Sequence, residues 1–118
     1  MSETLTLQEM FDRAVRGLSN QGWTRCTSDL KCVYSDGKGK HCAWGWVDQS
    51  LNKNVTGDVY ELHYAGIGLA NDLDYASVRF AQRLQSTHDF GALVPEKLKE
   101  QFKNLGIQYC LTWPEDVQ

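Results

Sequence analysis

Apolar side chains recur at helical spacing near the start of the chain. Thr6 and Glu9 form a capping-box pattern, in which each side chain accepts a hydrogen bond from the backbone N–H of the other residue. Gly22 can adopt the left-handed conformation that often ends a helix. The pattern predicts an amphipathic helix between Thr6 and Gly22, with an apolar face formed by Leu7, Met10, Phe11, Ala14, Val15 and Leu18.

The next apolar stretch alternates and contains a turn signal. The residues Asp36-Gly37-Lys38-Gly39 separate two β-prone runs, which predicts a β-hairpin over residues 30–47. A four-residue loop would place Cys32 and Cys42 on opposite faces, whereas a loop of three or five residues would place them opposite one another. We favour the second register because it gives one apolar face, formed by Leu30, Cys32, Tyr34, Cys42, Trp44 and Trp46.

Three further helices are predicted by residues that start or stop them. Asp58 and Asp74 are typical N-cap residues, and the helix after Asp74 should run to about His88. Pro95 is favourable at the first position of a helix, and Gly106 is placed to end that helix.

The last apolar stretch alternates as a strand does. Ile107, Tyr109, Leu111 and Trp113 alternate with polar or small residues, and Pro114 follows them. The sequence therefore predicts an α+β fold, in which an antiparallel hairpin or small sheet packs against three or four helices.

Composition indicates one folded domain. The 118 residues are 42% hydrophobic and 23% charged, so residues 1–118 should form a single globular domain. The N-terminus lacks the basic and apolar regions of a secretory signal, and no apolar run reaches the length of a membrane span. We expect a cytoplasmic protein without membrane contact, whose four cysteines remain reduced.

The charge distribution suggests where partners bind. A formal net charge of −3 argues against nucleic acid as a partner. The hairpin tip and its surroundings form a basic patch, and with a tryptophan anchor they give the predicted binding residues Lys38, Lys40, Arg25, His41 and Trp46. Carboxylates gather elsewhere, at Asp58, Glu61, Asp72 and Asp74. Separated patches of opposite charge can steer a chain onto a charged protein surface.

Cysteine and histidine provide two chemical alternatives. Zinc would find enough ligand types, but the sequence has no C-x-x-C pair, so we predict no metal and no cofactor. Nucleophilic catalysis could use Cys32 or Cys42 with His88 as base and Asp89 as its orienter. Free cysteines are more often buried packing residues, so we expect Cys32 and Cys42 to pack in the core.

Three short motifs resemble a known family. They are Cys32-Val33-Tyr34, Cys42-Ala43-Trp44-Gly45 and the run over residues 80–85, followed by His88-Asp89. The chain resembles small proteins of bacteriophages and proteobacteria for which no activity is known, and the resemblance implies a phage-encoded accessory protein. We therefore predict an interaction protein that binds a host or defence component. The alternatives are a small Cys/His-dependent enzyme and a binder of a nucleotide-like small ligand.

Overall fold

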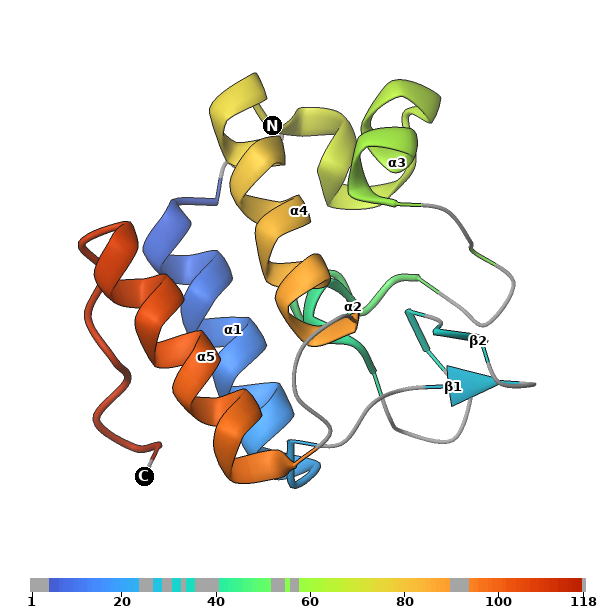
Figure 1. Ribbon diagram of the computed structural model, residues 1–118. Coiled ribbons are helices and arrows are strands. Elements are labelled where there is room, and N and C mark those ends of the chain that lie inside the picture. The colour runs from blue at the N-terminus through green and yellow to red at the C-terminus, as the bar shows by residue number, and fades with distance from the viewer. Residues whose placement is uncertain are drawn as a thin grey trace.

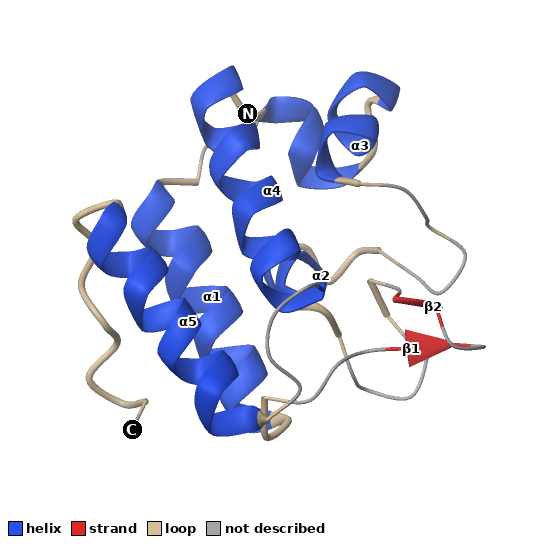
Figure 2. Cartoon of the chain, viewed as in Figure 1, coloured by secondary structure: helices blue, strands red, loops and turns tan. Residues whose placement is uncertain are grey.

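Helices make up most of the described part of the chain. The structure is a computed structural model that describes residues 5–23, 27–28, 31–32, 34–35, 41–51, 55, 58–89 and 94–117. Its helices are α1 (Leu7–Asn20), α2 (Ala43–Val47), α3 (Val59–Ala65), the 3₁₀ helix η1 (Gly68–Asp72), α4 (Tyr75–Asp89) and α5 (Pro95–Gln108). Two strands of two residues each, β1 (Thr27–Ser28) and β2 (Lys31–Cys32), pair antiparallel. Figure 2 shows how little of the chain these strands occupy.

The four helices predicted from their capping residues are confirmed. The Thr6 side chain accepts from the Glu9 backbone N–H at 3.1 Å, and the Glu9 carboxylate accepts from the Thr6 N–H at 3.2 Å. Asp58 and Asp74 cap α3 and α4 in the same way, each accepting a backbone N–H three residues later at 2.8 Å. Pro95 is the first residue of α5. Local capping hydrogen bonds mark the start of α1, α3 and α4, and the ring geometry of Pro95 suits the first position of α5.

α1, α4 and α5 surround the largest part of the core. Figure 1 shows α1 and α5 side by side and running in opposite directions, with α2 close to the C-terminal half of α4. Gly106 lies in α5 where that helix crosses α1, and a Cβ atom there would come within 2.8 Å of the Phe11 ring. Gly106 therefore does not stop the helix as predicted. It leaves room for the Phe11 ring of α1.

The predicted α+β fold is wrong, because the described part of the chain is helical and contains no hairpin over residues 30–47. Among the described residues, one antiparallel bridge forms across the predicted turn, between Ser35 and His41, and its register differs from the one that places Cys32 opposite Cys42. The second expected strand is instead the helix α2, and the backbone of Cys32 pairs with Thr27 and not with Cys42. The predicted turn at residues 36–39 lies outside the described residues.

Tertiary contacts explain why α2 is a helix. Its first two amides donate to side chains of α4: the Ala43 N–H to His88 Nδ1 at 3.2 Å, and the Trp44 N–H to Gln85 Oε1 at 3.0 Å. Free N–H groups at a helix start need such partners, and here they come from more than forty residues away. Local alternation of apolar residues could not predict these two acceptors.

The predicted strand over residues 107–113 is also wrong. Ile107 belongs to α5, and the chain reverses at Cys110, which has φ +57°. The backbone of Thr112 exchanges two hydrogen bonds with the side chain of Gln8 on α1, at 2.8 and 2.9 Å. Trp113 then stacks on Trp23 with ring centroids 6.1 Å apart. The alternation therefore reflects a segment that packs against α1, not a sheet.

Candidate functional site

The structure brings together two members of the predicted thiol–imidazole site. Cys42 is the residue that precedes α2, and the next residue donates its N–H to His88 of α4. Both Cys42 and His88 are 0% exposed. Because Nδ1 accepts a hydrogen bond, the ring proton of neutral His88 must be on Nε2. A substrate could reach this pair only if the junction between α2 and α4 opened.

Several predicted site residues lie outside what the structure describes. Lys38, Lys40 and Arg25 are among them, so the binding role of these basic residues remains a prediction. Cys32 is described only through its backbone in β2, and Asp89 only through its place at the end of α4.

The remaining two predicted binding residues, His41 and Trp46, lie against each other. Their rings meet edge to face with centroids 4.6 Å apart. Gln21 Oε1, at the end of α1, accepts from the Trp46 indole N–H and from the His41 backbone N–H, both at 3.0 Å. Trp46 also lies directly over Gly17, where any Cβ atom would overlap the indole. The indole is therefore held in one orientation and remains half-buried.

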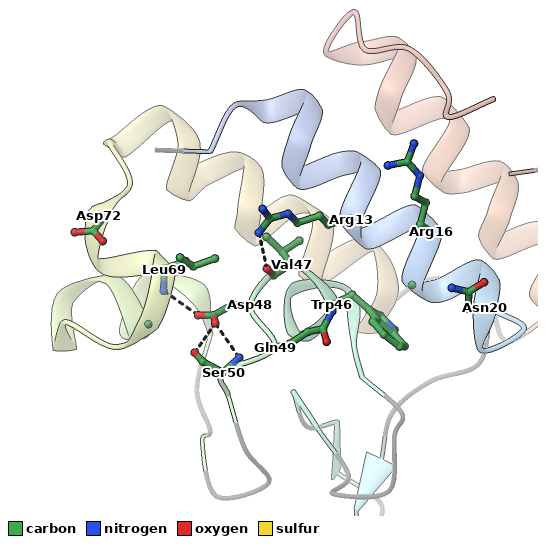
Figure 3. A pocket seen from close by; sticks show the side chains of 12 residues that line it. Arg13, Arg16, Asn20, Trp46, Val47, Asp48, Gln49, Ser50, Leu69 and Asp72 are labelled. Carbon is green, nitrogen blue, oxygen red and sulfur yellow. Dashed lines mark hydrogen bonds between the residues drawn. The ribbon is translucent and has the colours of Figure 1, made fainter. Parts of the chain in front are cut away.

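Trp46 lines an open groove of about 700 Å³. Figure 3 shows that one wall comes from α1, with Arg13 and Asn20 on it. The opposite wall comes from the segment that follows α2 and from η1, where Leu69 lies. The groove thus combines a guanidinium group, an indole and an amide on residues that are far apart in the sequence.

Asp48 fixes the wall of this groove. Its side chain is 3% exposed, and its carboxylate accepts from the backbone N–H of Leu69 at 2.8 Å and from the backbone N–H of Ser50 at 3.2 Å. The Ser50 hydroxyl donates to the same carboxylate. A Cβ atom on Gly68 would overlap Asp48, so glycine is required for this approach. A buried carboxylate with these donors joins the segment after α2 to η1.

The second arginine of the groove is engaged outside it. Arg16 Nε donates to both carboxylate oxygens of Asp116, at 3.1 and 3.0 Å. This hydrogen bond is the main reason that the pKa of Arg16 is raised and the pKa of Asp116 is lowered. Figure 3 shows the Arg16 side chain directed away from Asp48. Arg13 is directed toward the Val47 carbonyl oxygen, 3.4 Å from its Nη1.

A second surface lies at the end of the molecule formed by α3, η1 and the start of α4. Tyr64 is 77% exposed, Tyr75 is 62% exposed and Ile67 is 38% exposed. Sequence reasoning did not identify these side chains as functional. The signal was available, because the capping residues Asp58 and Asp74 place Tyr64 and Tyr75 on the identifiable helices α3 and α4. The groove had one signal in the sequence. Gly17 lies inside a helical pattern, where glycine lowers helix stability by about 1 kcal/mol relative to alanine.

Within the described ranges, no three His, Cys, Asp or Glu side chains are grouped closely enough to hold a metal ion. None of the described helices is both long enough and apolar enough to span a bilayer. Comparison with known protein families, with curated proteins and with solved structures gave no match.

Proposed function

We propose that this chain is a small phage-encoded protein that acts in the cytoplasm of the host by binding a host or defence protein, without catalysing a reaction. The resemblance of residues 32–34, 42–45 and 80–85 to small phage and proteobacterial proteins supports this origin. A phage accessory protein of this kind would act inside the bacterial cell, where it would meet such partners.

The exposure of Tyr64 and Tyr75 is the observation that carries the proposal. Burying a large apolar side chain contributes about 2 kcal/mol, and these two rings forgo most of that gain. Tyrosine is among the residues that dominate binding energy at protein interfaces. In contrast, Cys42 and His88 are enclosed in the core. The rings of Tyr64 and Tyr75 are therefore available to a partner, whereas the thiol of Cys42 and the imidazole of His88 are not.

Comparative capture from a proteobacterial lysate tests this proposal. The immobilised baits are the wild-type chain, the double variant Tyr64→Ala/Tyr75→Ala, and the double variant Lys38→Glu/Lys40→Glu. For a protein retained by the wild type, we expect the captured amount to be about tenfold or more lower with the tyrosine variant, because that variant lacks the interface anchors. Equal capture by the wild type and the tyrosine variant would exclude this surface. Loss of capture with the lysine variant alone would assign binding to Lys38 and Lys40.

The groove favours a second candidate, the binding of a nucleotide-like small ligand. Trp46 offers an aromatic face, Asn20 an amide and Arg13 a cationic group around about 700 Å³. These groups could recognise a base and a phosphate. Titration with AMP, ADP and ATP, followed through the NMR signal of the Trp46 indole N–H, tests this candidate. An unchanged signal at millimolar nucleotide would reject it.

A further inference from the structure

The negative charge of the chain is concentrated at one end of the molecule. The sequence contains 15 Asp and Glu residues and 12 Lys and Arg residues. Residues 58–79 contain four of these carboxylates and one cation, Arg79, and the remainder of the chain has eleven of each sign. The whole formal charge of −3 therefore belongs to this segment. Because α3, η1 and the start of α4 lie together at the top of Figure 1, we call this surface the acidic end.

The carboxylates of the acidic end have no cationic partner among the described residues. Hydrogen bonds from the Ser77 backbone and hydroxyl lower the pKa of Asp74. Asp58 accepts from a backbone N–H, and Asp72 accepts from the Asn71 side-chain amide at 3.4 Å. The ion pair recorded in the described part of the chain, Arg16 with Asp116, lies elsewhere. The negative field at this end is thus not neutralised within the described structure.

Large apolar side chains are exposed at the same end. Five large hydrophobic residues are exposed in the described part of the chain, and Tyr64, Ile67 and Tyr75 are three of them. Tyr64 lies near the end of α3, and Tyr75 is the first residue of α4. An interface typically has an aromatic centre surrounded by a charged rim. The acidic end has both parts.

The sign of the charge selects the kind of partner. Nucleic acids and anionic membranes carry the same sign as the acidic end, so both would be repelled. A second copy of this chain using the same face would place like charges together. Lysine and arginine side chains, in contrast, pair with carboxylates and also bind over the faces of tyrosine rings.

We propose that the acidic end binds a lysine- and arginine-rich surface of another protein, with Tyr64 and Tyr75 as anchors. This inference depends on the proposed function and specifies the chemistry of its partner. Surfaces of this kind occur on nucleic-acid-binding proteins, which use them to contact phosphates.

A titration with a defined probe tests the inference. The ¹⁵N-labelled full chain is titrated with a synthetic peptide of alternating arginine, lysine and leucine, and backbone amide shifts are measured. We expect the shifts to concentrate in residues 58–79, and we expect added salt to weaken binding. The variant Tyr64→Ala/Tyr75→Ala, which leaves the net charge unchanged, should lower affinity about tenfold.

Charge reversal at matched positions separates specific docking from general attraction. Glu61 lies in the first turn of α3 and Glu96 in the first turn of α5, and both are exposed. The variant Glu61→Lys/Asp72→Lys should lower peptide affinity about tenfold or more, whereas Glu96→Lys/Glu100→Lys should change it by about twofold or less. Circular dichroism checks that each variant is folded. Equal losses for the two reversals, or shifts spread over all carboxylate-bearing helices, would overturn the inference.

The two proposals can fail separately. In the lysate capture, Glu61→Lys/Asp72→Lys serves as a fourth bait. If the tyrosine variant loses the captured protein and this charge-reversed variant retains it, the surface binds a partner that is not basic, and only the inference is wrong. If neither variant changes capture, the proposed function at this surface is wrong as well.

Discussion

The hydrogen bonds from α2 to α4 make a quantitative prediction about stability. His88 and Gln85 accept from the adjacent amides of Ala43 and Trp44, at 3.2 and 3.0 Å. All four residues are buried, with exposed fractions of 0 to 5%. A buried donor left without an acceptor costs about 1–3 kcal/mol. The substitution Gln85→Met keeps the length of the side chain and removes its acceptor.

We expect Gln85→Met to lower the free energy of unfolding by about 1–3 kcal/mol, and His88→Leu to lower it by a similar amount. His88→Asn should recover part of the loss, because the asparagine Oδ1 atom is placed much as Nδ1 is in histidine. The two donors are adjacent, so water that reaches one can reach the other. The double variant should therefore lose less free energy of unfolding than the two single variants lose together.

Urea unfolding followed by circular dichroism measures these changes, and hydrogen exchange locates them. In the variants, the amides of Ala43 and Trp44 should exchange faster than those of α1. Gln108→Met is a matched control, because Gln108 is exposed and its removal should change stability by no more than about 0.5 kcal/mol. If Gln85→Met and His88→Leu both matched this control, the acceptors on α4 would not hold α2.

Three shorter predictions concern other contacts. Gly17→Ala should destabilise the chain by about 1–3 kcal/mol despite better helix propensity, because its Cβ atom displaces Trp46, and tryptophan fluorescence should shift. Arg16→Ala should raise the pKa of Asp116 in an NMR titration. Because the folded pKa is lowered, the stabilisation by this pair is present above about pH 4 and is lost as the pH falls through the folded pKa. Native Cys42 should react slowly with iodoacetamide, and rapid labelling would contradict its burial.

The elements that were predicted correctly are those whose signals are local. Thr6, Asp58 and Asp74 each accept a hydrogen bond from a backbone N–H three residues later. Such a contact depends only on neighbouring residues, so a sequence pattern is sufficient to identify it. Pro95 likewise acts through its own ring geometry.

The elements that were predicted wrongly depend on distant residues. The alternation of Cys42, Trp44 and Trp46 is typical of a strand, yet acceptors on α4 and the space over Gly17 favour a helix there. In a five-residue helix, tertiary contacts outweigh the β propensity of tryptophan. The groove could not be predicted for the same reason, since its walls are joined by contacts such as that from Asp48 to Leu69.

Folding explains some residues of the acidic end and leaves others unexplained. Asp58 and Asp74 cap helices, so an aspartate would be expected at these positions in a chain that binds nothing. Tyr64 and Tyr75 have no such role, because rings that are 77% and 62% exposed add little to the core. Large exposed aromatic groups also promote unwanted association. Their presence beside carboxylates that have no cationic partner within the described ranges is therefore better explained by a partner than by folding, and the substitutions at these tyrosines are the decisive ones.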